Sequence, residues 1–249
     1  MRRNWKAGLV VALLLTSMLL YGLNYIFYRD ATYIGKLVTM QLASVPLTTI
    51  LVTLFLNRVI SSREQRARKS KLNMVIGSFF SEVGRPLVAL ISSFDPNRER
   101  LRAELDLGDK WLAEDFARAR AAACDLSSST QLKVQSDKAR LNEIHRFLSD
   151  RRLFLQGLVQ NPALLERDSF ADMLLAVFHL AEEMDSRPDL NSLGDSDYAH
   201  LSGDVKRAYT SLLTEWVSHS AYLKDGYPYL YSLVVRSNPL KGLASAEVL

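Results

Sequence analysis

Two long runs without a charged residue dominate the first part of the chain. The first covers Ala7 to Tyr28 and the second covers Leu37 to Asn57, lengths of 22 and 21 residues. At about 1.5 Å per residue, a helix of either length crosses the apolar core of a bilayer. We predict two transmembrane helices, at 7–28 and 37–57, that form an antiparallel hairpin. A cleaved signal peptide is the alternative for the first run, but this run is long for one and no A-x-A-like site follows it.

Downstream of the second run, apolar positions recur with the 3.6-residue period of amphipathic helices. Residues 72–83 carry such a stripe, Arg85-Pro86 interrupts it, and the apolar character then resumes. We expect this segment to pack in a domain core, and the alternative is that it lies partly on a membrane surface. Glu82 in its middle, with Arg85-Pro86, excludes a third span.

The rest of the chain predicts helix after helix, because no segment alternates in a way that favours a sheet. We therefore predict an all-α fold, with an N-terminal transmembrane hairpin at 1–57, a basic segment at 58–71 and a cytoplasmic α-helical bundle at 72–249. Within the bundle we predict helix starts at Asp95-Pro96, Asp109, Asn161-Pro162, Ser169 and Pro228, one long helix over Tyr198–Leu223, and a loop over Arg187–Asp197.

Basic residues are concentrated beside the predicted hairpin. Residues 1–57 carry a net charge of +4, residues 58–71 carry +5 and residues 72–249 carry −5. By the positive-inside rule we expect a multi-pass protein of the plasma (inner) membrane with both termini in the cytoplasm. Residues 58–71, the basic collar, fix this topology and are suited to bind anionic lipid headgroups. The collar's basic residues are Arg58, Arg63, Arg66, Arg68, Lys69 and Lys71.

A polar stripe in the second span bears on assembly. Gln41, Ser44 and Thr48 share one helix face, which favours a hydrogen-bonded seam between helices, and a pore lining is the alternative. No Asp, Glu, Lys, Arg or His lies in either span to mark an ion path. Since two spans bury little surface alone, we expect a homo-oligomer. The acidic body argues against nucleic acid as a partner.

Signatures of catalysis and metal binding are largely missing. The chain has no P-loop, GxGxxG, HExxH, GxSxG or ExxH motif, so we expect no metal or cofactor. The single cysteine, Cys124, excludes an internal disulfide, and its alanine-rich surroundings favour a small buried residue. His179, Glu182 and Glu183 lie opposite the apolar side of their helix, which is typical of a solvated face.

One pair of residues is a weak candidate for a catalytic or ligand-binding site. His219 lies on the apolar stripe of the long helix with Trp216, and Glu215 precedes it by one turn. A buried imidazole beside a carboxylate is suited to act as a general base or a ligand, with His145 as a possible second partner. The alternative is a core histidine held by one hydrogen bond.

Two segments carry a resemblance to known sequences. NMVIGSFFSEVG at 73–84 and LKDGYPYLYSLVVRSNP at 223–239 resemble blocks of an uncharacterised group of prokaryotic membrane proteins. That group has two N-terminal transmembrane helices and a cytoplasmic helical domain, so the resemblance implies this architecture and no activity.

Together these patterns favour a non-enzymatic function. We expect a membrane-anchored cytoplasmic interaction or sensory-regulatory module that is oligomeric. A small oligomeric channel gated by its cytoplasmic domain is the first alternative. A membrane-tethered hydrolase or metal enzyme built around Glu215 and His219 is the second.

Overall fold

The computed structural model describes the backbone of residues 4–29, 31–165 and 167–241. Over these ranges every regular element is a helix, which confirms the predicted all-α class. The chain divides into two compact units, Met1–Ala67 and Arg68–Leu249, and each is described by itself.

The N-terminal unit consists of α1 (Asn4–Tyr28) and the first part of α2 (Ala31–Phe79). Arg29 separates them in a left-handed conformation, with φ of 47°, and its N–H donates to the carbonyl of Tyr25 at 2.9 Å. The second helix, α2, begins at Ala31, which is earlier than the predicted span that starts at Leu37. Thr32–Ser61 is long and apolar enough to cross a membrane; its most apolar window has a mean hydropathy of 1.7 and no buried residue.

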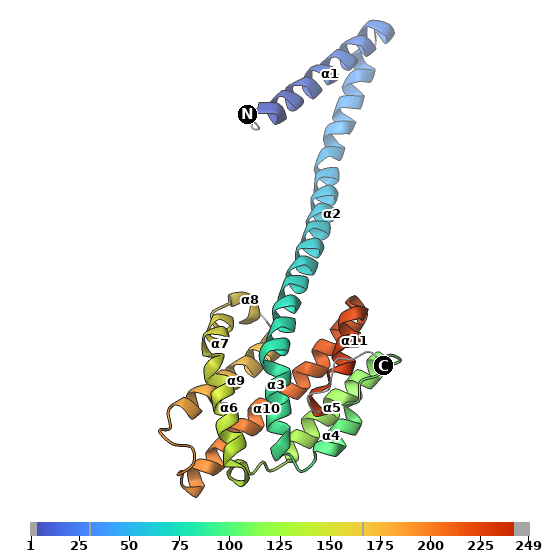
Figure 1. The fold of residues 1–249 in the computed structure, drawn as a ribbon. Helices are drawn as coiled ribbons and strands as arrows, with labels where there is room; N and C mark the ends of the chain where they lie inside the picture. The colour runs from blue at the N-terminus through green and yellow to red at the C-terminus, as the bar shows by residue number, and fades with distance from the viewer. Residues whose placement is uncertain (1–3, 30, 166, 242–249) are drawn as a thin grey trace. The chain divides into compact units, whose positions relative to one another are not determined.

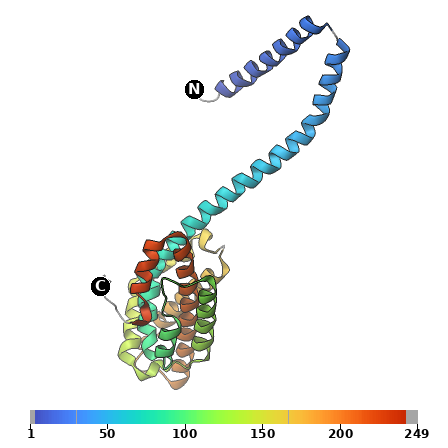
Figure 2. The same ribbon diagram turned by 90° about the vertical axis from the view of Figure 1, so that its right-hand side faces the viewer.

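The C-terminal unit is built from the end of α2 and a series of further helices (Figures 1 and 2). These are the π-helical turn η1 (Phe80–Gly84), α3 (Arg85–Ile91), η2 (Ser92–Phe94), α4 (Arg98–Glu104), α5 (Ala113–Ser129), η3 (Val134–Ser136), α6 (Lys138–Asp150), α7 (Arg152–Val159), α8 (Pro162–Leu165), α9 (Asp168–Asp185), α10 (Asp195–Gly226), α11 (Pro228–Arg236) and η4 (Pro239–Lys241).

The long helix α10 forms the centre of this unit, since it packs against α3, α5, α9 and α11. Residues such as Leu201, Leu212 and Trp216 are almost fully buried along it. Acidic residues in its first turn favour its start, and Tyr227 separates it from α11, which begins at Pro228. The predicted long helix and the predicted helix at Pro228 are both confirmed.

The segment after the basic collar belongs to the core, as expected. Ile76, Phe79 and Val83 are fully buried, and 44% of the most apolar window of Ser70–Phe94 is buried. The chain does not break at Arg85-Pro86 as predicted: a single π turn, Phe80–Gly84, precedes this pair, and α3 begins at Arg85.

The π turn has a local chemical cause in Pro86. Proline has no N–H, so the carbonyl of Glu82, four residues earlier, loses its normal helical donor. The side chain of Arg151 takes this role, because its Nε donates to the Glu82 carbonyl at 2.9 Å. Arg151, the residue just before α7, thus supplies the hydrogen bond that the backbone of the π turn lacks.

Two predicted helix starts are wrong. Helix α4 begins after Asn97, whose N–H bonds to the carboxylate of Asp95 at 2.8 Å, so the Asp95-Pro96 pair forms a turn. Helix α5 begins at Ala113 and not at Asp109. The expected start at Asn161-Pro162 is correct, since α8 begins at Pro162.

The prediction that Cys124 is buried is also wrong. In α5 it is Ala119 and Ala123 that point into the core, with exposed fractions of 1% and 0%, whereas Cys124 is exposed. Because alanine fits both a core and a surface, the alanine run gave no periodicity from which to assign the inward side.

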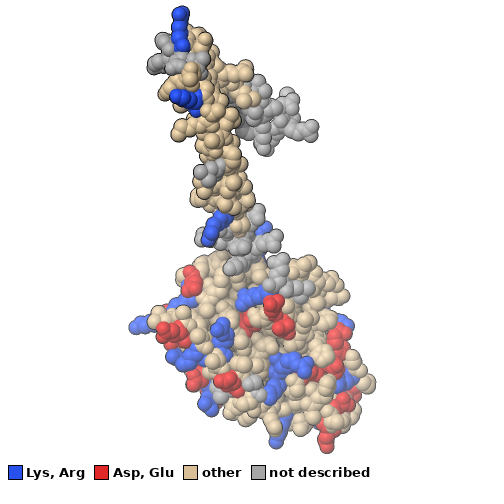
Figure 3. All heavy atoms as spheres, turned by 180° about the vertical axis from the view of Figure 1, so that it is seen from behind, with Lys and Arg blue, Asp and Glu red and all other residues tan. Residues whose placement is uncertain are grey.

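The surface of the C-terminal unit shows both signs of charge. On the face in Figure 3, acidic and basic side chains are interspersed over the body. Such mixing is typical of a solvated surface.

Candidate functional site

An apolar groove lies between the end of α2, the π turn and helices α10 and α11. Its volume is about 330 Å³, at the lower end of the range for small-molecule sites. The wall is mainly aromatic and aliphatic, and includes Met74, Phe80, Trp216, Tyr227, Leu230 and Leu233.

His219 is the buried ionisable group of this groove, as its position on the apolar stripe predicts. The residue is 3% exposed, and its ring stacks on Phe80 with centroids 5.4 Å apart and planes 16° apart. Among the described residues, none is hydrogen-bonded to its Nδ1 atom. Burial, and secondarily the charge of Arg167, lowers the pKa of His219 from 6.5 to about 4. The imidazole is therefore neutral at physiological pH.

The structure does not bring Glu215 and His219 together as a hydrogen-bonded pair. Glu215 is 4% exposed and accepts a hydrogen bond from Nη2 of Arg167 at 2.9 Å. His145, the predicted second partner, bonds instead to Asp185 of α9 at 2.8 Å. The three residues thus belong to separate interactions and do not form one catalytic or metal-binding set.

The rim of the groove carries a guanidinium. Arg85 is half-buried and donates to the Ser237 hydroxyl and to the Phe80 carbonyl. Burial lowers the pKa of Arg85 from its ordinary value of 12.5. Because arginine stays protonated in proteins, this group keeps its positive charge beside an apolar wall.

Two glycines border the groove under different constraints. A Cβ atom on Gly77 would lie 3.6 Å from Nε2 of His219, which is ordinary contact, so a small side chain fits. A Cβ atom on Gly84 would lie 2.5 Å from Cδ1 of Phe80. Glycine at position 84 therefore lets the Phe80 ring fold back against the π turn and form the groove wall.

The predicted membrane residues are only partly described. Ser44 donates to the carbonyl of Gln41, and Thr48 donates to that of Ser44, so both hydroxyls bond within their own helix. In the basic collar, Arg58 and Lys71 are exposed, and the other basic side chains lie outside the described residues, namely Arg63, Arg66, Arg68 and Lys69.

His179 lies on an exposed face of α9, as the sequence predicts, but it is part of a cluster of charged groups there. The imidazole is half-exposed, but its Nε2 lies 3.7 Å from Asp204 of α10, and the neighbouring Glu183 lies 3.5 Å from His200 of that helix. Sequence reasoning missed this cluster, although a signal was present in the four-residue spacing of a histidine and a carboxylate on each helix.

These features define an all-α protein with a helical body and a long apolar N-terminal segment. The profile described as "Uncharacterized protein MJ1433, C-terminal helical domain" matches residues 68–236, and that of its N-terminal helical domain matches residues 1–60. The curated relative "Uncharacterized protein MJ1433" from Methanocaldococcus jannaschii is 36% identical over 237 residues, covering 95% of this chain and 94% of the relative. The chain belongs to this family. No solved structure matches it significantly.

The family membership confirms part of the predicted resemblance. The sequence blocks at 73–84 and 223–239 indicated an uncharacterised helical family, and both the family profiles and the archaeal relative bear this out.

Proposed function

We propose that the protein is a membrane-anchored sensory-regulatory module whose C-terminal unit binds a small amphipathic anion in the groove. The composition of the groove wall is the observation that supports this kind of ligand. The wall is apolar apart from a neutral imidazole and a few polar groups. Of the described residues that line it, Arg85 alone has a permanent charge. An apolar tail gains from burial against this wall, and a carboxylate head gains charge-assisted hydrogen bonds from the guanidinium.

The membrane anchor is supported by the exposed apolar surface of the N-terminal unit. Large side chains such as Leu51, Leu54 and Phe55 are each at least 60% exposed. In water such a surface is unfavourable, and a bilayer or a second copy of the chain covers it. With the basic collar directly after this segment, the positive-inside rule supports cytoplasmic termini, and we propose that the protein is a homo-oligomer of the inner membrane.

The alternative functions have less support from the geometry. The hydroxyls of Ser44 and Thr48 donate their hydrogen bonds to carbonyls of their own helix. The predicted stripe therefore keeps few hydrogen-bond donors for the water of a pore. A hydrolase based on Glu215 and His219 lacks the hydrogen bond through which a carboxylate orients an imidazole base.

Fluorescence of Trp216 tests ligand binding, because this residue lines the groove. In a full-length chain carrying Trp5→Phe and Trp111→Phe, a brominated medium-chain fatty acid should quench Trp216 in a saturable manner. The uncharged methyl ester of the same acid should bind at least about tenfold more weakly, as loss of one charge-assisted contact predicts.

Two glycine variants provide the matched comparison. Gly77→Val places a branched side chain in the groove beside His219 and should abolish saturable quenching. Gly157→Val makes the same change in α7, where nothing lies within 4 Å of the new Cβ atom, and should leave quenching intact. Equal quenching in both variants, or equal affinity for acid and ester, would contradict the proposed ligand site.

The exposed Cys124 tests the membrane topology with the chain's own thiol. A membrane-impermeant maleimide should label Cys124 only after cells are permeabilised. In a Cys124→Ser chain, Thr32→Cys should be labelled in intact cells, because Thr32 lies at the start of α2, next to the turn that the proposed topology puts outside the cell. Labelling of Cys124 in intact cells would refute the proposed orientation, and recovery of the chain without detergent would refute the anchor.

A further inference from the structure

Helices α9 and α10 each present a histidine followed four residues later by a carboxylate. These are His179 and Glu183 on α9, and His200 and Asp204 on α10. Residues four apart lie one above the other on a single helix face. The two helices are joined by the short segment 186–194 and pack against each other.

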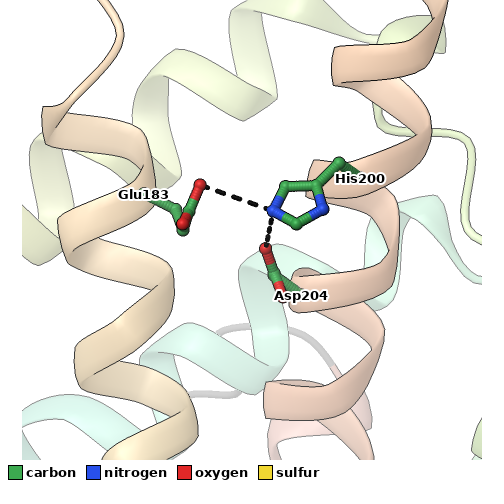
Figure 4. Close-up of side chains that lie close together, drawn as sticks. All are labelled: Glu183, His200 and Asp204. Carbon is green, nitrogen blue, oxygen red and sulfur yellow. Dashed lines mark ion pairs between the residues drawn. The ribbon is translucent and has the colours of Figure 1, made fainter.

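The antiparallel packing brings the two pairs together with their order reversed, so that Glu183 of α9 lies beside His200 and Asp204 of α10 (Figure 4). Nε2 of His200 lies 3.5 Å from Oε2 of Glu183 and 3.3 Å from Oδ2 of Asp204. Nε2 of His179 lies 3.8 Å from Oε1 of Glu183 and 3.7 Å from Oδ1 of Asp204. Each carboxylate therefore lies between the two imidazoles.

The burial of the Asp204 carboxylate independently indicates that this cluster binds a cation. Its side chain is 3% exposed, and within the part of the chain that the structure describes, its Oδ2 atom accepts no hydrogen bond. A buried carboxylate oxygen is costly unless it is paired or coordinates a metal. The group nearest to Oδ2 in the cluster is the imidazole of His200, whose Nε2 lies 3.3 Å away.

We infer that Glu183, His200 and Asp204 bind a divalent transition-metal ion of the zinc class, with His179 as the fourth group of the site. Ligands about 2.0–2.1 Å from a tetrahedral zinc ion lie about 3.3 Å from one another. The separations of His200 from the two carboxylates, 3.3 and 3.5 Å, match this edge. Imidazole and carboxylate are the ligand types that zinc and its neighbours accept.

The arginines beside the cluster hold the carboxylates in place. Nη1 of Arg187 donates to Oε2 of Glu183 at 2.8 Å, and Nη1 of Arg207 donates to Oδ1 of Asp204 at 3.2 Å. Oδ2 of Asp204, which faces His200, stays available. Such outer hydrogen bonds to ligating carboxylates orient the ligands of a metal site.

The site is open to an ion from solution. The side chains of His179 and His200 are 46% and 56% exposed, whereas Asp204 forms the buried floor. The inferred site is independent of the groove, since none of its residues lines the groove.

Zinc uptake by the tag-free, full-length chain in mild detergent tests the inference. The wild-type chain should retain one equivalent of Zn²⁺ in competition with a chromophoric chelator. His200→Gln and Asp204→Asn should each weaken binding by at least about tenfold, since removal of even outer-shell partners has that effect. Added Co²⁺ should give the intense visible absorption of a four-coordinate site in the wild-type chain and lose it in both variants.

His145→Gln is the matched control, because His145 also pairs with a carboxylate, Asp185, but outside the cluster. It should bind Zn²⁺ as the wild-type chain does. His200 is half-exposed, so its variant keeps the fold and decides the question even if Asp204→Asn unfolds. Absence of uptake by the wild-type chain, or equal uptake by wild type and His200→Gln, would overturn the inference and leave an ion-pair network.

Discussion

Replacement of His219 by leucine tests whether the imidazole of the groove is held in its neutral form. Burial lowers the pKa of His219 from 6.5 to about 4. At a pH between these two pKa values, His219 binds a proton in the unfolded chain but not in the folded chain. The free energy of unfolding must therefore fall as the pH is lowered through this window, and it levels off below pH 4. At 1.36 kcal/mol per pKa unit, the full effect is about 3 kcal/mol.

Urea unfolding of the full-length chain at pH 7 and pH 4.5 measures this effect. Lowering the pH should destabilise the wild-type chain by about 2 kcal/mol more than it destabilises His219→Leu. At pH 7 the leucine variant should be as stable as the wild type or more so, because an imidazole with an unpaired Nδ1 is exchanged for an apolar side chain. His219→Gln keeps a polar group without a titration, and it should lose the same pH dependence.

A pH dependence that is equal in the wild type and in both variants would refute this reasoning. It would mean that His219 is protonated as readily in the folded chain as in the unfolded chain. A large loss of stability of His219→Leu at pH 7 would instead indicate a hydrogen-bonded role for the imidazole.

Two further predictions concern hydrogen bonds that cross between elements. Arg151→Met should lower the free energy of unfolding by about 1 kcal/mol, because the carbonyl of Glu82 loses its donor. With Pro86→Ala, which restores a backbone N–H, the loss should shrink, and a double-mutant cycle in urea would detect this coupling; additive effects would count against it. Arg167→Met should cost about 3 kcal/mol, since Glu215 is left buried and unpaired. The added change Glu215→Gln should recover most of that loss in the same assay, and failure to recover would refute the pairing.

The helices of the C-terminal unit could be predicted well wherever one side of the helix is apolar. Phe170, Leu174 and Val177 of α9 are fully buried, as their spacing predicts. Helix starts were predicted less well, because an aspartate such as Asp95 bonds to a nearby N–H in a turn as readily as at a helix end. The burial predicted for Cys124 is wrong because its neighbouring alanines do not indicate which side of the helix faces the core.

The candidate site could be predicted only in part. The burial of His219 follows from the period of α10, but the choice of Arg167 as partner of Glu215 depends on a residue 48 positions earlier in the chain. The cluster on α9 and α10 was missed for a related reason. His179 and His200 are exposed, whereas Asp204 is buried among the apolar residues of α10, and only the packing of the two helices makes the four groups converge.

The central position of α10 has a consequence for the order of folding. Its partners α9 and α11 are its neighbours in sequence, whereas α5 packs on it after a long intervening stretch of chain. Contacts between neighbours form quickly, because little chain must be ordered to close them. The α9–α10–α11 segment should therefore assemble first and α5 should dock late. Mutations in α5 would then mainly accelerate unfolding, while those in α9 would slow folding.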